Sequence, residues 1–295
     1  TGLWFANLFF GETLSLNCEF EKGLEYFKKS LDLGLLENNP IEIEFAKSCI
    51  CTFNYIYRGN IDLAYQTSKG SLTMAKDSDD IFLKGAAYSS YGMSCYCKGL
   101  FDEAKNSLLK ALNFSEKTTQ FGWGPWVCGF LGHVYFDMGE YIKAQKYYKE
   151  GISTLERAKL YAFWFYLWKV SIERAKVFSK DKNVNLGEVI ECYDNIRPRA
   201  GKGWAARYIG EILLDFDNKY RSEAEDWLEK AIEADKSNGT MWSLGADYAS
   251  YAKLFKREND LLRAKQNVNK AIEIFRECGA DGWVEKYENE LATFS

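Results

Sequence analysis

The sequence has few of the residues that break helices or that carry side-chain chemistry. Among its 295 residues there are three prolines and one histidine. So few prolines leave room for long helices, since a proline inside a helix costs about 3 kcal/mol. With a single histidine, the sequence argues against a zinc site and against a nucleophilic cysteine activated by a histidine.

Other absences narrow the function further. The phosphate-binding pattern Gly-x-x-x-x-Gly-Lys-Ser/Thr does not occur, so any ATPase activity must lie outside this segment. The longest aromatic and apolar stretch starts at Leu160 and meets a charge at Lys169, which is short of the ~20 residues that span a membrane. The net charge of -4 and the pI of about 5.4 argue against nucleic acid or an anionic membrane as partner.

The eight cysteines follow no framework spacing, and no signal segment is evident, so we expect a reducing, cytoplasmic environment. Two pairs, Cys49-x-Cys51 and Cys95-x-Cys97, resemble metal knuckles at first sight. On a helix, however, residues two apart point about 200° away from each other, so both thiols cannot reach one ion. We interpret them as core cysteines and expect neither a metal nor a cofactor.

The most informative stretch is FLGHVYFDMGEYIKAQKYYKEG, residues 130–151. Its first half places a large residue, a glycine and Tyr135 on one helical face, and the glycine leaves a hole that a neighbouring helix can enter. After a break at 138–140, Ala144, Tyr148 and Gly151 form a second apolar stripe with small residues. The stretch predicts a helical hairpin whose two helices pack closely.

The small residue of the second helix recurs along the chain. The matching positions are Gly23, Ala64, Ala104, Ala144, Ala224 and Ala264, with spacings of 41, 40, 40, 80 and 40 residues. Val189 fills the long gap imperfectly. The first-helix triplet recurs as well, for example at Tyr91-Gly92 and Ile209-Gly210. A repeat of about 40 residues therefore organises nearly the whole sequence.

This pattern of large-Gly-x-x-Tyr followed by Ala and Tyr/Phe resembles the tetratricopeptide repeat (TPR), although the period exceeds the usual ~34 residues. The resemblance implies an all-α solenoid of about seven helical hairpins, closed by a terminal helix with one apolar and one wet face. We expect a single superhelical domain over 1–295, with repeats near 1–38, 41–78, 80–119, 124–158, 160–198, 203–238 and 240–278 and a cap helix at 281–294.

The two ends of the sequence suggest a context. The first residues read as the middle of a helix and do not begin with methionine, so we expect the chain to be part of a longer polypeptide. Residues 271–283 and the helix after them resemble the C-terminal end of bacterial multidomain signalling proteins, in which a nucleotide cyclase or another output domain precedes an AAA-type ATPase and a TPR tail. That resemblance implies a regulatory or sensor role.

In TPR proteins the first helices line a concave groove, and the resemblance places certain residues of this chain there. The groove would run from aromatic at its N-terminal end to basic at its C-terminal end, suited to a protein or peptide, or to another domain of the same chain. The candidate groove residues are Phe5, Phe53, Tyr57, Tyr96, Trp126, His133, Phe136, Trp204, Arg207, Lys253, Lys256 and Arg257. The alternative is that many of these aromatic side chains are buried in the hydrophobic core and line no groove.

The predicted function is therefore a non-catalytic module for binding a protein or peptide. A stand-alone peptide-sensing TPR protein is an alternative. A third alternative is an α/α-toroid enzyme such as a glycoside hydrolase, for which Glu211 and Asp215 would be the paired carboxylates on one helical face. Against this last alternative, the repeat pattern is that of an open solenoid, and chance carboxylate pairs are common in a chain with 42 acidic residues.

Overall fold

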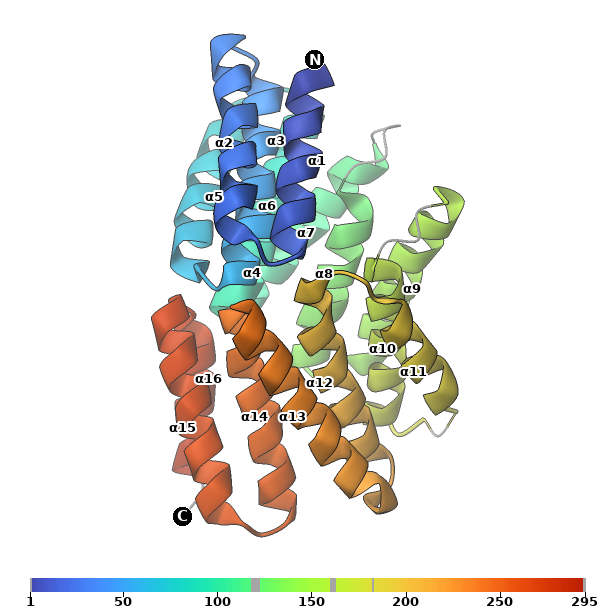
Figure 1. The fold of residues 1–295 in the computed structure, drawn as a ribbon. Coiled ribbons are helices and arrows are strands. Elements are labelled where there is room, and N and C mark those ends of the chain that lie inside the picture. Colours follow the sequence, from blue (N-terminus) through green and yellow to red (C-terminus); the bar gives the residue numbers. More distant parts are fainter. Residues whose placement is uncertain (1, 118–122, 160–162, 182, 294–295) are drawn as a thin grey trace.

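The structure is a computed structural model that describes residues 2–117, 123–159, 163–181 and 183–293, and within these ranges every regular element is a helix. Antiparallel neighbours pair into seven hairpins, and a single helix follows the last of them (Figure 1). The predicted all-α solenoid with a C-terminal capping helix is thereby confirmed. The predicted start of the fifth repeat, at residue 160, lies outside the described residues.

The hairpins follow one another in chain order. Their helices are α1 (Gly2–Leu16) with α2 (Phe20–Leu36); α3 (Pro40–Cys49), the π-helix η1 (Ile50–Tyr55) and α4 (Ile56–Arg58) with α5 (Ile61–Lys76); α6 (Ile81–Lys98) with α7 (Phe101–Glu116); α8 (Gly124–Asp137) with α9 (Tyr141–Arg157); α10 (Phe163–Phe178) with α11 (Leu186–Asn195); α12 (Arg199–Phe216), the short 3₁₀ turn η2 (Asn218–Tyr220) and α13 (Arg221–Asn238); and α14 (Met241–Arg257) with α15 (Leu261–Cys278), followed by α16 (Asp281–Ala292).

A hole at the first-helix glycine lets the two helices of a hairpin pack closely. A β-carbon on Gly132 would lie 2.3 Å from the ring of Tyr148, and one on Gly92 would lie 2.7 Å from the Leu108 side chain. In regular hairpins the first helix ends on a left-handed residue such as Gly139 (φ +79°), after which the next amide donates back to the helix. Close packing therefore needs glycine where the repeat pattern predicted it.

The solenoid winds tightly enough for its end to touch its beginning. The turns of hairpins two and three rest on the starts of α14 and α16, and α1 touches α12 (Figure 1). Hairpins one, two and three thus each meet the hairpin or the cap helix that lies five positions later in the chain. At this inter-turn interface a β-carbon on Gly99 would lie 2.6 Å from the backbone at Trp283. The Trp242 indole N–H donates to the Cys97 carbonyl at 2.8 Å, and that of Trp283 donates to the Tyr96 carbonyl at 3.0 Å.

Lys98 makes polar contacts across the same inter-turn interface. Its ammonium group donates to the Gly279 carbonyl at 2.8 Å and lies 2.8 Å from Asp281 and 3.0 Å from Asp62. Two of these partners follow α15, whereas Asp62 starts α5. The first and last thirds of the chain are thus joined by hydrogen bonds as well as by apolar packing, and the spiral is closed.

Candidate functional site

The first helices converge on the axis of the spiral with a set of rings that we call the axial cluster: Tyr57, Tyr96, His133, Trp204 and Trp242. They come from α4, α6, α8, α12 and α14, and each side chain is at most 5% exposed. The His133 ring centroid lies 5.1 Å from that of Trp204 and 5.9 Å from that of Tyr96, and Trp204 lies 6.2 Å from Trp242. Tyr57, Tyr96, His133 and Trp204 are among the predicted groove residues, whereas Trp242 is not, and the structure packs all five rings against one another.

His133 lies at the centre of the axial cluster as a neutral imidazole. Its Nδ1 is 2.8 Å from the Tyr148 hydroxyl and 3.3 Å from the Tyr208 hydroxyl. Burial lowers the pKa of His133 well below its ordinary value, and the positive charges of Arg174 and Arg207 lower it further. Within the described residues its Nε2 has no hydrogen-bond partner.

An ion pair lies beside the rings. The Arg174 guanidinium from α10 pairs with the Glu211 carboxylate from α12, which also accepts a hydrogen bond from the Ser250 hydroxyl. Burial alone would raise the pKa of Glu211, but Arg174 and the neighbouring cations outweigh it and lower that pKa to about 2. The guanidinium carbon lies 3.6 Å from the ring centroid of Phe136 and 4.1 Å from that of Tyr208, so the cation is enclosed by rings.

A second buried charge group involves two carboxyls. Arg207 Nε lies 3.0 Å from Asp247 Oδ1, and the Thr240 hydroxyl donates to Asp235 at 2.7 Å. Burial and the proximity of the two carboxyls raise the pKa of Asp247, and burial also raises that of Asp235, because Arg207 compensates for one negative charge only. The pair therefore takes up a proton at a higher pH than isolated aspartates do. Gly203 makes room for it, since a β-carbon there would lie 2.1 Å from Asp235.

Some polar atoms on the axis are buried without a partner among the described residues. They are the Tyr57 hydroxyl, His133 Nε2 and Arg207 Nη2. A buried polar group without a hydrogen bond costs about 1–3 kcal/mol. These donors and acceptors are therefore suited to hydrogen-bonding a polar chain such as a peptide backbone, if the turns of the spiral separate.

The structure places the other predicted groove residues differently. Phe53 and Phe136 are buried between helices, Trp126 is half-buried on α8, and Phe5 is exposed on the outward face of α1. Within the described residues, Phe5, Phe53 and Phe136 make no ring contact with the axial cluster. In this conformation the buried residues offer no surface to a partner, so the predicted groove stays a prediction that requires the spiral to open.

The predicted basic end is largely matched by carboxylates of the same chain. Arg257 pairs with Asp215 and donates to the Leu214 carbonyl, while the Lys256 ammonium lies 3.7 Å from Glu290. Lys253 is half-buried, and its charge helps to lower the pKa of Glu211.

The carboxylates considered for glycoside hydrolysis are engaged separately. Glu211 is buried with Arg174, whereas Asp215 is bound to Arg257. They do not face each other across a cleft in the described contacts.

Sequence reasoning missed several members of this site. Arg174 was missed because hairpin five departs from the repeat spacing and was not mapped. Asp247 and Asp235 were missed because a lone aspartate in a helix gives no pairing signal. The usable signal was the register of α12, where Trp204, Tyr208 and Glu211, spaced i, i+4 and i+7, occupy one helical face.

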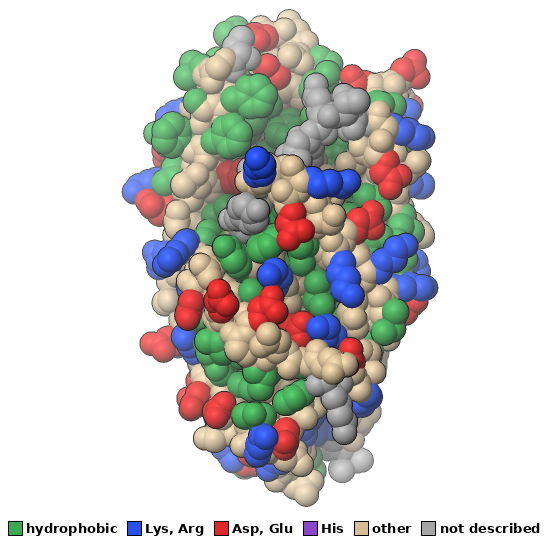
Figure 2. All heavy atoms as spheres, turned by 90° about the vertical axis from the view of Figure 1, so that its right-hand side faces the viewer, with side chains coloured by type: hydrophobic (Ala, Val, Ile, Leu, Met, Phe, Trp, Pro, Cys, Tyr) green, Lys and Arg blue, Asp and Glu red, His purple; other side chains and the backbone are tan. Residues whose placement is uncertain are grey.

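Hollows open on the outer surface rather than over the axial cluster. One of about 240 Å³ lies between α9, α10 and α11, with Ile152 and Val189 among its apolar lining and Lys169 and Glu188 among its polar lining. Figure 2 shows acidic and basic side chains interspersed with apolar ones over this side of the molecule. Another, of about 500 Å³, lies between α5, α6 and α7.

The described residues hold no group of three or more His, Cys, Asp or Glu side chains placed to bind a metal ion. A search of the same residues for a helix long and apolar enough to cross a membrane finds none. All eight cysteines are free, and seven of them are buried.

Comparison with known proteins agrees with this architecture. Residues 127–154, most of α8 and α9, match the tetratricopeptide repeat family. No curated protein matches the chain.

Solved structures with a similar fold cover nearly all of the chain at low sequence identity. A Rap protein complexed with competence and sporulation factor has a TM-score of 0.71 and 11% identity, over 97% of this chain and 80% of that one. The apo form of RapI has a TM-score of 0.54 and 13% identity, over 99% and 87%. A tetratricopeptide repeat protein from Parabacteroides merdae has a TM-score of 0.50 and 10% identity, over 98% and 100%.

Fold and repeat match together define the class of the molecule as an α-solenoid built from helical hairpins. More specifically, one hairpin matches the tetratricopeptide repeat, and the fold is that of a tetratricopeptide repeat array wound into a closed spiral.

Proposed function

We propose that the protein is a non-catalytic module that binds a protein or peptide along the axis of its spiral, after the inter-turn interface opens. The observation that carries this proposal is the set of polar atoms near the axis that have no hydrogen-bond partner among the described residues, because a bound chain would satisfy them. The similar Rap structure is that of a complex with competence and sporulation factor, which supports a binding role. Opening the spiral costs free energy, so the apparent affinity for the ligand is lower than the affinity of the open form.

The finer context belongs to the same proposal. A single domain of seven repeats within a longer polypeptide, acting as a cytoplasmic regulatory or sensor region of a bacterial signalling protein, is consistent with a closed spiral that a ligand opens. Another domain of the same polypeptide would then be a partner as acceptable as a free peptide. The stand-alone peptide sensor remains the alternative.

The proposal is tested with a library of random heptapeptides selected against the protein, followed by calorimetry on the peptides recovered. Tyr57→Phe removes a hydroxyl that has no hydrogen-bond partner in the part of the chain that the structure describes, so it should not lower the free energy of unfolding. It should weaken peptide binding by about 2–10-fold if that hydroxyl bonds the ligand. Tyr26→Phe, on the outer helix α2, is the matched control.

Trp283→Phe tests the opening step. It removes the indole bond to the Tyr96 carbonyl at the inter-turn interface, so the radius of gyration in X-ray scattering should rise and peptide affinity should increase. Trp227→Phe on α13, which packs on Tyr193 outside the axis, is the control and should change neither. The proposal is overturned if neither Tyr57→Phe nor Trp283→Phe changes the affinity for the recovered peptides and the peptides cross-link to the outer surface.

A further inference from the structure

The first helix carries an aromatic face that no described element covers. Phe5 and Phe9 are 54% and 63% exposed, with their ring centroids 6.4 Å apart. The adjacent side of α1 is buried: Trp4 is 3% exposed and packs on Phe45 of α3 at 5.9 Å. The helix therefore has a normal packed side toward hairpin two and an unpacked aromatic side away from it.

Register within the repeat explains what this aromatic side corresponds to. Phe5 and Phe9 stand six and two residues before Gly11, the small residue that receives Phe27 of α2. The equivalent pairs in other first helices are Ala86 and Ser90, Trp126 and Phe130, Trp204 and Tyr208, and Ala246 and Ser250. All of these except the half-buried Trp126 are buried.

Those equivalent positions make contacts with the preceding hairpin. Ser90 lies 3.4 Å from Ser48 of α3, and the Phe130 ring lies 5.8 Å from Tyr96 of α6. Tyr208 lies under Arg174 of α10 in the same way. The face of Phe5 and Phe9 is thus the continuation of an interface that recurs along the array, at the one hairpin where nothing described occupies it.

Among the first helices, α12 matches α1 in chemistry as well as in register. The segment Phe5-Ala-Asn-Leu-Phe-Phe-Gly-Glu12 aligns with Trp204-Ala-Ala-Arg-Tyr-Ile-Gly-Glu211, sharing two aromatic positions, the alanine, the glycine and the glutamate. In α12, Tyr208 and Glu211 meet α10, whose Arg174 stacks on Tyr208 and pairs with Glu211.

Among the described residues, Glu12 of α1 has no cation beside it that corresponds to Arg174 beside Glu211. The residue is half-buried, and burial raises its pKa to about 7 without a cation to offset the effect. The equivalent Glu211 is buried more deeply, yet Arg174 from the preceding hairpin holds its pKa near 2. The contrast indicates a partner that brings a positive charge to Glu12.

We propose that the stacking face of α1, formed by Phe5, Phe9 and Glu12, binds a helical hairpin in tandem repeat register. Its first helix carries an arginine or lysine that covers Phe9 and pairs with Glu12, as Arg174 does with Tyr208 and Glu211. A second copy of this chain does not supply such a helix, because its α10 is already packed between α8, α9 and α12. The occupant is therefore a hairpin of this chemistry and not a symmetric copy of α1.

The test places a copy of hairpin five, residues 160–198, directly ahead of Gly2 of the full chain. The fusion should raise the thermal midpoint by at least about 3 °C if the hairpin docks. In the fusion, Phe9→Glu, Glu12→Gln, or replacement of the added copy's arginine by methionine should each remove most of that rise. In the unfused chain, Phe9→Glu should cost little, since the ring is exposed.

Phe10→Glu is the matched control, because Phe10 is 58% exposed but leans toward Tyr26 of α2 rather than into the stacking face. It should leave the rise in the fusion intact. The proposal is overturned if the fusion gives no rise, or a rise that Phe9→Glu and Phe10→Glu reduce equally. It is also overturned if the unfused chain forms a dimer in light scattering that Phe9→Glu abolishes, since the face would then be a self-association surface.

Discussion

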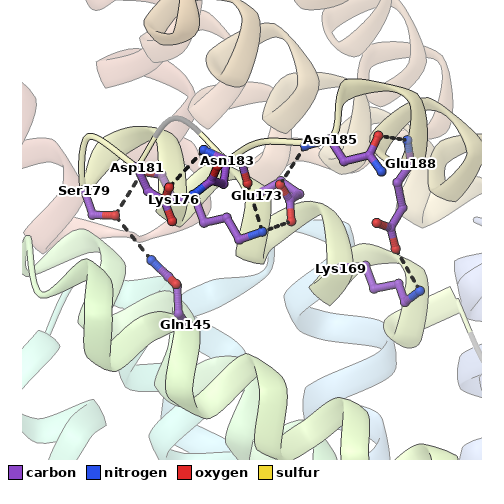
Figure 3. Close-up of polar contacts among 9 residues, drawn as sticks. All are labelled: Gln145, Lys169, Glu173, Lys176, Ser179, Asp181, Asn183, Asn185 and Glu188. Atoms are coloured by element: carbon purple, nitrogen blue, oxygen red, sulfur yellow. Dashed lines mark hydrogen bonds and ion pairs between the residues drawn. The ribbon is translucent and has the colours of Figure 1, made fainter.

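Hairpins four and five lie side by side but are held together in different ways. In hairpin four the Tyr148 ring fills the space above Gly132, and α9 runs for 17 residues along its partner. In hairpin five the second helix, α11, has 10 residues, and a network of polar contacts over residues 169–188 ties it to α10 (Figure 3). The regular hairpin is specified by shape and the irregular one by hydrogen bonds.

The polar network of hairpin five centres on Glu173. Its carboxylate accepts from the Lys176 ammonium at 2.7 Å and from the Asn185 backbone N–H at 3.1 Å, which fixes the connection leading into α11 (Figure 3). The Asn185 side chain then accepts from the amide of Glu188 and caps the helix. Such ties are local, so we expect their loss to loosen α11 while the rest of the spiral stays packed.

The largest effect should come from filling the hole in hairpin four. A methyl group in Gly132→Ala would meet the Tyr148 ring, which is completely buried and hydrogen-bonded to His133, so the ring has little freedom to retreat. We expect a loss of about 1–3 kcal/mol in the free energy of unfolding, measured by urea denaturation. Gly70→Ala is the control: a β-carbon there meets nothing within 4 Å, so it should gain about 0.5–1 kcal/mol. Equal changes in the free energy of unfolding for Gly132→Ala and Gly70→Ala would contradict the claim that the fit of Tyr148 over Gly132 holds hairpin four together.

The pH dependence of stability tests the same core. The folded state keeps His133 neutral, whereas the unfolded chain takes up a proton as the pH falls through 6.5. His133 therefore costs stability as the pH falls below 6.5, at up to about 1.4 kcal/mol per pH unit. In His133→Gln this part of the acid loss should be absent.

The measurement is the difference between the two proteins in free energy of unfolding, taken from pH 7.5 to pH 5. Glu12 and Glu44, whose pKa values burial raises to about 7, act with the opposite sign and are common to both proteins. The difference between the proteins therefore isolates His133. A difference that stays constant over this range would show that the imidazole is not kept neutral.

The two hairpins also differ in how far the sequence predicts them. Gly132, Tyr135 and Tyr148 follow a local periodicity, because the contacts they make lie within one hairpin, and so the fold class could be predicted from the sequence. Hairpin five lacks the glycine and replaces it with a connection whose hydrogen bonds have no periodicity. Its key residue for the site, Arg174, was therefore missed.

Closure of the spiral was beyond sequence reasoning for another reason. The repeat pattern gave the inward direction of Tyr57, Tyr96 and Trp204 but not their exposure. Exposure depends on the angle between successive hairpins, and small changes in that angle add up over five of them before Gly59 meets Trp242. Periodicity within 40 residues carries no information about a contact across some 180 residues, so an open groove was expected where the structure has a packed axis.

A moderate effect is expected from the network of hairpin five. Glu173→Gln removes the ion pair with Lys176 and weakens the bond to the Asn185 amide, for a loss of about 1 kcal/mol. Hydrogen exchange should quicken over residues 183–196, while the amides of α9 keep their protection, because the lost bonds are local. Faster exchange spread evenly over α9 and α11 would mean that the two hairpins unfold as one unit.

The smallest effect belongs to the outer edge of the same network. The Lys169 ammonium lies 3.0 Å from Glu188, but the two side chains are 34% and 41% exposed, so solvent screens much of their attraction. Lys169→Met should change the free energy of unfolding by no more than about 0.5 kcal/mol, since the methionine keeps the apolar contact with the hollow between α9 and α11. If Lys169→Met cost more than Glu173→Gln, the surface pair rather than the buried carboxylate would hold α11 in place. Hairpin five would then be held by its surface ion pair, and Glu173 would no longer explain how it differs from hairpin four.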